Sequence, residues 1–246
     1  MDPDRDGGGS LTRLVVFDVD STLLEVETLD FALEMAAGPG AGPDLARRLE
    51  AVTSAGMEGA LDLSESLSRR LSLVTLTRAD VDAAAAGIAA RATPGIPSLL
   101  SDLRARGDHL RAVSGGFLPL VLPALSRLGF GPGHVRANAF RWEGEGAVVA
   151  GFEEGSPLAR SGGKAAVVRE LRAELEPDVT IVVGDGITDL EAWEAGAADR
   201  FIGFGGVARR EAVAERAPEY AEDVEELRGL LLGRGPGASG PGATYR

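Results

Sequence analysis

The 246-residue chain contains no cysteine, which excludes disulfides, thiol catalysis and cysteine-ligated metals. No apolar run approaches the roughly 18 residues that a membrane span requires, and the first ten residues lack the apolar segment of a secretory signal. Basic residues are also few, 25 against 38 acidic ones, so the net charge is −13 at pH 7. We therefore expect a cytoplasmic protein that binds neither nucleic acid nor a membrane surface.

Several polar residue types are nearly missing. The chain has one lysine, Lys164, one asparagine, Asn138, and no glutamine, whereas arginine is abundant. Arginine is a planar fork and lysine a compact point charge, so the two are not interchangeable. Lys164 is therefore either a chance survivor or a position that needs the compact ammonium, and composition leaves both open.

The only two histidines, His109 and His134, lie at the start of a predicted strand and of a predicted hairpin, outside any motif. The chain therefore has no histidine in a motif that could serve a phosphohistidine mechanism or a Ser-His-Asp triad. We interpret both residues as core histidines.

Short apolar runs that end in Gly, Ser or Asp predict the strands of a parallel sheet. Helical stretches alternate with them, which favours an α/β fold with a doubly wound parallel sheet. The predicted strands cover 14–17, 109–114, 179–184 and 199–205, and the predicted helices cover 95–107, 117–128, 164–176 and 189–196.

Two segments interrupt this alternation. Residues 25–93 contain helical patterns and no clear strand, and they are far longer than a βαβ crossover needs, so they predict an inserted helical cap. Residues 135–152 contain two β-rich runs around Glu-Gly-Glu-Gly, which predicts a β-hairpin flap beside the site. The core then comprises 11–24 and 94–232, and the Gly-rich and polar ends, 1–10 and 233–246, are expected to be disordered tails.

The strongest local signal follows the first strand, where Asp18 and Asp20 stand two residues apart in Asp-Val-Asp-Ser-Thr. Two carboxylates at the ligand-binding edge of an open α/β sheet repel each other unless a cation or a substrate lies between them. Helix capping is an alternative for Asp20 and Thr22. It does not account for Asp18 at the tip of an apolar strand.

A second acidic motif, Gly-Asp-Gly-Ile-Thr-Asp, follows the third predicted strand and contributes Asp185 and Asp189. If this strand neighbours the first, four carboxylates meet at one edge, and carboxylate oxygens without His or Cys favour Mg²⁺. Asp189 is alternatively the N-cap of the helix that follows. Between the acidic motifs, Ser114-Gly115-Gly116 offers a hydroxyl and main-chain N–H groups to an anion, and Lys164 opens a helix after Ser-Gly-Gly.

The order of these four motifs resembles the haloacid dehalogenase-like phosphatase superfamily, and within it the phosphoserine phosphatase family, over roughly residues 12–230. Further stretches that support the resemblance are Glu27, the cap segments around Met57 and Arg70-Leu71-Ser72-Leu73, Thr93-Pro94-Gly95, Phe117, and Phe201-Ile202-Gly203-Phe204-Gly205-Gly206.

The resemblance implies a Mg²⁺-dependent phosphomonoester hydrolase that acts on O-phospho-L-serine. It makes Asp18 the nucleophile that forms an aspartyl-phosphate, and Asp20 the general acid and then the base. It also assigns the remaining site residues: Asp18, the Asp20 carbonyl and Asp185 to Mg²⁺; Asp189 to a supporting role; Ser114, Gly115 and Lys164 to the phosphoryl group; Glu27, Met57 and Arg70 to the serine moiety; Thr188 and Arg210 to further site positions.

Two departures from the family pattern bear on the substrate. Val207 stands where a polar residue is common, and Leu63 where an aromatic residue is frequent. Without the resemblance, Glu27 and Arg70 would read as solvated cap residues. Three functions therefore stay open: hydrolysis of phosphoserine, hydrolysis or transfer of another small phosphomonoester, and a non-catalytic phosphate-binding regulator.

Overall fold

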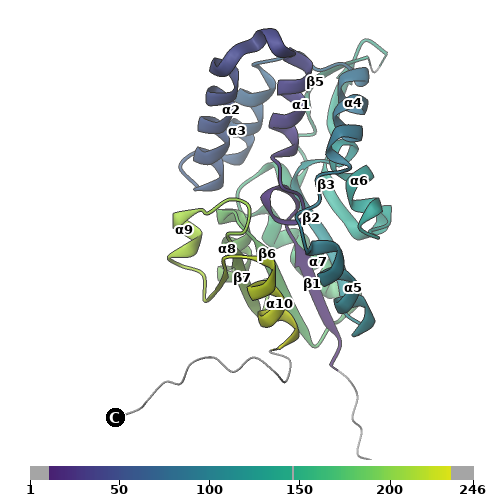
Figure 1. The fold of residues 1–246 in the computed structure, drawn as a ribbon, viewed down its shortest axis with the longest axis vertical. Coiled ribbons are helices and arrows are strands. Elements are labelled where there is room, and N and C mark those ends of the chain that lie inside the picture. The colour runs from purple at the N-terminus through teal and green to yellow at the C-terminus, as the bar shows by residue number, and fades with distance from the viewer. Residues whose placement is uncertain (1–10, 146, 234–246) are drawn as a thin grey trace, which may run out of the picture.

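The computed structural model describes residues 11–145 and 147–233, so the predicted tails at 1–10 and 233–246 lie, except for Gly233, outside the described residues. A parallel six-stranded sheet in the order β3-β2-β1-β6-β7-β8 forms the centre of the molecule (Figure 1). This confirms the predicted doubly wound α/β class. The strands are β1 (Arg13–Phe17), β2 (His109–Phe117), β3 (Val135–Asn138), β6 (Val179–Gly184), β7 (Arg200–Phe204) and β8 (Glu219–Ala221).

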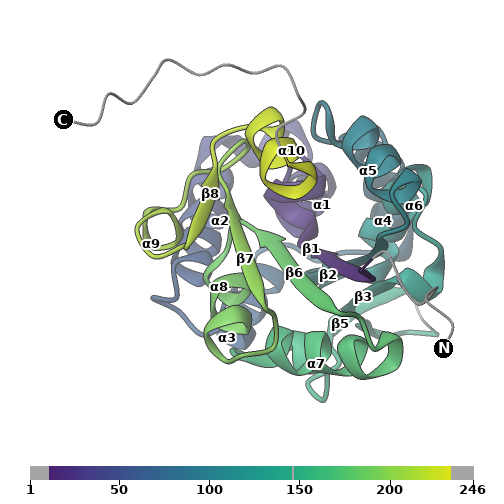
Figure 2. The ribbon, with the colours of Figure 1, turned by 90° about the horizontal axis from the view of Figure 1, so that it is seen from below.

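Helices cover both faces of the sheet because the central strands are apolar on both sides. In β1, Val15 and Phe17 pack into one hydrophobic cluster, whereas Leu14 and Val16 pack into the other. Helices α5, α6 and α10 lie on the first face, and α7 and α8 lie on the second (Figure 2). The core helices are α5 (Ile96–Ala105), α6 (Leu118–Arg127), α7 (Gly163–Leu175), α8 (Ile187–Glu194), α9 (Glu211–Ala214) and α10 (Val224–Leu232).

The insertion between β1 and β2 is helical and stands above the end of the sheet at which β1 finishes (Figure 1). It contains α1 (Thr28–Ala37), α2 (Gly42–Met57), α3 (Leu63–Leu71) and α4 (Arg78–Ile88). Its two connections to the core run side by side through an antiparallel bridge between Leu24 and Ala92. In the described part of the chain, no helix is long and apolar enough to cross a membrane.

The hairpin is shorter than predicted. Val135–Asn138 joins the parallel sheet as β3 beside β2, and only β4 (Phe140–Glu143) and β5 (Val148–Phe152) form the antiparallel pair. The sequence pattern placed both runs in one hairpin because alternation within a strand does not show which strand is its partner. Phe140 stacks on Phe117 with ring centroids 3.9 Å apart, which fixes the base of the hairpin against the sheet.

Candidate active site

Two buried carboxylates meet at the carboxyl ends of the two central strands. Phe17 of β1 pairs with Val183 of β6, so Asp18 and Asp185 leave the sheet side by side. The Asp18 main-chain N–H donates to the Val183 carbonyl at 2.8 Å, and the two acidic residues are only 4% and 1% exposed. Burial, followed by the charges of Asp18 and Glu27, raises the pKa of Asp185 well above its ordinary value.

Lys164 supplies the positive charge at this edge. Its Nζ lies 2.9 Å from Asp18 Oδ1 and 2.6 Å from Asp189 Oδ1, and the residue is 5% exposed. Burial alone would lower the pKa of the ammonium, but the two carboxylates outweigh it and raise the pKa. Burial and the Asp18 charge raise the pKa of Asp189 to about 7, against the pull of Lys164. The single lysine of the chain thus bridges two of the four acidic residues of the motifs.

A close backbone approach fixes the position of Lys164. A Cβ on the preceding residue, Gly163, would lie 1.6 Å from the Pro157 carbonyl oxygen, so only glycine fits there. Helix α7 begins at Gly163, and the first turn therefore carries the lysine to the end of β1. A cation in a first turn is unfavourable for the helix dipole. Contacts with Asp18 and Asp189 offset that cost.

Asp20 lies in the turn Val19–Leu23 that follows β1, where its backbone leaves helical angles. The Thr28 main-chain N–H donates to Asp20 Oδ2 at 3.1 Å, and the Thr28 hydroxyl lies 3.0 Å from both carboxylate oxygens. Burial raises the pKa of Asp20 well above its ordinary value, with further contributions from Glu27 and Asp18. The Asp20 carboxyl therefore retains a proton to higher pH than a free aspartate.

Ser114, Gly115 and Gly116 close the end of β2. The Gly116 N–H donates to Ser114 Oγ at 2.8 Å, which leaves the hydroxyl hydrogen available to another acceptor. A Cβ on Gly116 would approach Ser114 Oγ and Thr28 Oγ1 to 3.0 Å, so glycine lets the strand end pack against the Asp20 support. The segment thus presents donors to a ligand next to Asp18 and Lys164.

Arg70 enters the site from helix α3 of the cap and is 7% exposed, so it is not a solvated surface residue. Its Nη1 donates to Asp30 Oδ1 at 3.3 Å and to Thr53 Oγ1 at 3.1 Å, and Thr53 donates to Asp30 Oδ2 at 2.6 Å. Among the described residues, the buried Arg70 Nε has no hydrogen-bond partner. One guanidinium donor therefore remains for a ligand.

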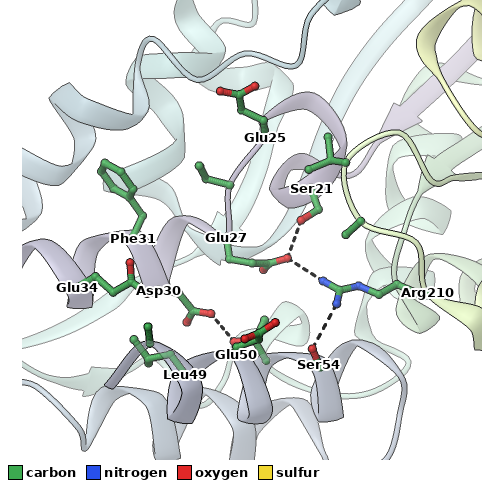
Figure 3. A pocket seen from close by; sticks show the side chains of 15 residues that line it. Ser21, Glu25, Glu27, Asp30, Phe31, Glu34, Leu49, Glu50, Ser54 and Arg210 are labelled. Carbon is green, nitrogen blue, oxygen red and sulfur yellow. Dashed lines mark hydrogen bonds and ion pairs between the residues drawn. The ribbon is translucent and has the colours of Figure 1, made fainter. Parts of the chain in front are cut away.

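Glu27 joins the core motifs to the cap (Figure 3). The Ser21 hydroxyl donates to Glu27 Oε1 at 2.8 Å, and Arg210 Nη2 donates to the same oxygen at 3.1 Å. Burial raises the pKa of Glu27 against the effect of the Ser21 bond. Arg210 also lies 3.4 Å from Asp185 Oδ2 and 3.5 Å from Ser54 Oγ, so it ties the acidic motif after β6 to helix α2.

One narrow cavity of about 40 Å³ between core and cap brings most of the predicted site residues together. Leu63, one of the two departures from the family pattern, contributes to its wall. The lining residues are Asp18, Asp20, Glu27, Leu29, Met57, Leu63, Leu67, Arg70, Ser114, Gly115, Gly116, Lys164 and Thr188.

Arg210 and Val207 line a different cavity of about 350 Å³, which shares Glu27 with the first (Figure 3). Glu25, Glu34 and Glu50 make this neighbouring cavity strongly acidic. The structure thus places Arg210 behind Glu27 and beside Asp185. A direct contact of Arg210 with a substrate stays a prediction.

Three residues at the site carry no motif signal. Thr28 holds Asp20, and Asp30 holds Arg70. Asn138 joins the end of β2 to the turn before α7 by donating to the Gly115 carbonyl at 2.8 Å and the Leu158 carbonyl at 3.1 Å. Asn138 is 1% exposed. Asn138 is the only residue of the chain with an amide side chain, and this rarity was the signal available in the sequence. The one amide stands where two buried carbonyl groups need a hydrogen-bond donor.

The donor set fits a magnesium ion with few protein ligands. Within the described residues, no group of three or more His, Cys, Asp or Glu side chains is arranged to hold a metal ion by itself. Mg²⁺, however, usually keeps several waters and takes one or two carboxylates plus substrate phosphate oxygens. Asp18 and Asp185, whose charges oppose each other in a buried place, are such carboxylates, and the Asp20 carbonyl follows on the same turn.

The fold and the site define the class of protein. The haloacid dehalogenase-like hydrolase family matches residues 15–194, and the chain belongs to it. Within this class, the mouse phosphoserine phosphatase is 36% identical over 217 residues, which cover 88% of this chain and 92% of the mouse protein. The chain is therefore a member of the family that contains the phosphoserine phosphatases.

Solved structures agree with this placement. A phosphoserine phosphohydrolase-like protein from Francisella tularensis superposes with a TM-score of 0.81 at 26% identity, covering 89% of this chain and 99% of that one. A phosphoserine phosphatase in the form of a phospho-aspartyl intermediate analogue has a TM-score of 0.75 at 27% identity, with coverage of 89% and 99%.

Proposed function

We propose that the protein hydrolyses O-phospho-L-serine to L-serine and phosphate, with Mg²⁺ as cofactor. The observation that carries the proposal is a single cavity with two chemically different ends. Asp18, Lys164 and Ser114 line the end at the sheet, and Glu27 and Arg70 line it from the cap side. A phosphate group suits the first end, and the ammonium and carboxylate of an amino acid suit the second.

Asp18 is the proposed nucleophile. Its carboxylate oxygen forms a bond to phosphorus while the bond from phosphorus to the serine oxygen breaks, which leaves an aspartyl-phosphate. Water then attacks phosphorus, releases inorganic phosphate and restores the Asp18 carboxylate. The phospho-aspartyl intermediate analogue of a structural relative supports this route.

Charge on the phosphoryl oxygens must be neutralised during both transfers. Lys164 provides a fixed ammonium, and the Ser114 hydroxyl and the Gly115 N–H provide donors on the same side. Asp18, the Asp20 carbonyl and Asp185 would hold Mg²⁺, which supplies further charge neutralisation when bound. Asp189 holds Lys164 in place at 2.6 Å.

Asp20 is the proposed general acid. Its raised pKa leaves a proton available for the departing serine oxygen, and the resulting carboxylate then takes a proton from the attacking water. Asp20→Asn keeps an oxygen for the Thr28 N–H but cannot transfer a proton. We expect turnover of phosphoserine to fall by roughly 10² to 10⁴-fold.

The leaving group provides the matched control for Asp20→Asn. Nitrophenolate departs without a proton, so the substitution should reduce phosphate release from p-nitrophenyl phosphate far less than release from phosphoserine. Equal losses on both substrates would remove the acid role from Asp20.

The cap residues are proposed to select the amino-acid part of the substrate. Glu27 meets the ammonium group, the free Nε of Arg70 meets the carboxylate, and Met57 covers the bound serine. Leu63 occupies less of the cavity than an aromatic residue would. The sheet edge contacts phosphate alone and treats small phosphomonoesters alike, so selectivity depends on these cap contacts.

Arg70→Ala tests this selectivity. A substrate carboxylate left without its partner in a desolvated site costs ~2–5 kcal/mol, so kcat/KM for phosphoserine should fall while that for phosphoethanolamine, which has no carboxylate, changes little. The two substrates in the two proteins form a double-mutant-style cycle. Phosphoserine should lose its advantage over phosphoethanolamine in the variant.

Asp30→Asn is the control for structural damage, because it disturbs the partner of Arg70 but keeps the guanidinium. It should preserve the preference for phosphoserine. Equal losses on both substrates in Arg70→Ala would favour another small phosphomonoester as the substrate, and absence of turnover across a panel of phosphomonoesters with Mg²⁺ would favour a phosphate-binding regulator. The cytoplasmic location stays a prediction of the sequence.

A further inference from the structure

A third polar cavity lies at the opposite end of the sheet from the active site. It has a volume of about 240 Å³, and its lining includes Arg104, His109, Arg111 and His134. Strand β3 begins opposite Ala112, so the first three residues of β2 have no neighbouring strand on that side. The missing pairing leaves a notch between the end of α5 and the start of β3. Figure 2 views the molecule from this end.

The lining is cationic in a protein whose net charge is −13. Both histidines of the chain and two arginines gather here, and the histidines are exposed. The expectation that His109 and His134 are core residues is therefore wrong. His109 is the first residue of β2 and His134 precedes β3, and both lie at strand ends where the sheet meets solvent.

Asp108, the one acidic residue in the lining, is already neutralised. Its carboxylate accepts two bonds from Arg13, at 2.9 and 3.0 Å, and two from Arg106, at 3.2 and 2.9 Å. The side chain of Asp108 is 3% exposed. Glu174, which pairs with Arg136 at 3.6 Å, acts on Arg111 only as a weaker opposing charge. Because the Asp108 carboxylate is already paired with Arg13 and Arg106, it does not offset the positive charges of Arg104 and Arg111.

Arginine donors are available in this cavity. Arg111 uses Nη1 on the Leu110 carbonyl at 2.9 Å, and its buried Nε has no partner within the described part of the chain. Arg104 donates through Nη2 to the Leu128 carbonyl at 2.6 Å, and its guanidinium lies 5.3 Å from the centre of the Phe130 ring. Two guanidinium groups on separate elements are therefore held in fixed orientations.

We propose that this cavity binds a phosphate group, either inorganic phosphate or the phosphate of a small metabolite, through Arg104, Arg111 and the two histidines. A tetrahedral dianion accepts donors from several directions, and guanidinium forks match its oxygens. Positive charges whose one acidic neighbour in the lining is already paired bind such a dianion more strongly than they bind a single carboxylate. Consistent with this, burial and then Arg111 and Arg104 lower the pKa of His134.

Histidine NMR signals provide a selective test, because the chain has only two histidines and both lie in this cavity. The full chain without added histidines is titrated at constant pH and without Mg²⁺, first with inorganic phosphate and then with phosphoglycolate. Sodium chloride at matched ionic strength is the control. We expect both imidazole Cε1–H signals to shift with saturation for the preferred phosphate source, and not for chloride.

Arg111→Gln should weaken binding by roughly 10-fold or more, the loss of one charge-assisted hydrogen bond. Arg104→Met keeps an unbranched chain against Phe130 and should weaken binding in the same way. Arg48→Gln, an exposed arginine of α2, removes the same charge elsewhere and should leave the titration unchanged. Arg111→Gln should also keep full phosphatase turnover, because β2 carries this cavity and the active site at opposite ends.

Shifts that merely follow ionic strength, as with chloride, would overturn the proposal. Equal titrations in wild type and Arg111→Gln, with dispersed spectra that show a folded protein, would also overturn it. If phosphate binds only at the active site, which Arg111→Gln does not alter, the histidine signals stay fixed while phosphate still inhibits turnover. That result would overturn the second site without touching the proposed hydrolase activity.

Discussion

Asp18→Asn should reduce phosphate release from phosphoserine by more than roughly 10⁴-fold, because loss of the attacking group removes the covalent route altogether. The substitution exchanges one oxygen for an amide nitrogen of similar size. The main-chain bond from Asp18 to the Val183 carbonyl is unaffected. Chemistry should therefore be lost without loss of the fold, which steady-state phosphate release and thermal unfolding measure together.

Asp82→Asn, at an exposed position of helix α4, is the matched control and should retain wild-type turnover. Phosphate release by Asp18→Asn within tenfold of the wild-type rate would exclude Asp18 as the nucleophile. Aspartyl-phosphate chemistry would then have to begin at another carboxylate of the cavity.

Lys164→Arg should be nearly inactive, although the chain uses arginine at every other basic position outside its histidines. The Lys164 ammonium contacts Asp18 and Asp189 within 2.9 Å while 5% exposed, and a guanidinium is too wide to take that place. Removal of one preorganised donor of this kind costs ~3–4 kcal/mol of transition-state stabilisation. The measurement is kcat/KM for phosphoserine at saturating Mg²⁺.

Arg169→Lys on the same helix tests the reverse exchange at an exposed position and should leave kcat/KM unchanged. Melting temperatures of both variants separate damage to the fold from damage to the site. A wild-type rate in Lys164→Arg would show that the single lysine is a compositional accident.

Two kinds of contact hold the active-site residues in position. Residues on strand ends, such as Asp18 and Asp185, are fixed by the ladder of the central sheet. Glu27 and Arg70 are instead fixed by side-chain contacts to Ser21, Arg210 and Asp30. Substitutions that change substrate preference should therefore concentrate in the second group, where a pocket can change without loss of the sheet register.

Sequence alone determined the class of fold and the placement of the core motifs at one edge of the sheet. Apolar runs mark β1, β6 and β7 because buried parallel strands are apolar on both faces. Asp18 follows β1, Asp185 follows β6, and Ser114 ends the apolar run of β2, so chain order already places them at one edge. Lys164 stood out because its residue type occurs once.

Only the tertiary structure decided which neighbours surround those residues. Val135–Asn138 looks like half of a hairpin but pairs with β2, and Arg210, 25 positions beyond Asp185, reaches both that residue and Glu27. His109 and His134 are exposed, although their sequence setting suggested burial. Periodicity reports which face of an element is apolar, whereas pairing and side-chain contacts between distant segments depend on how those faces pack.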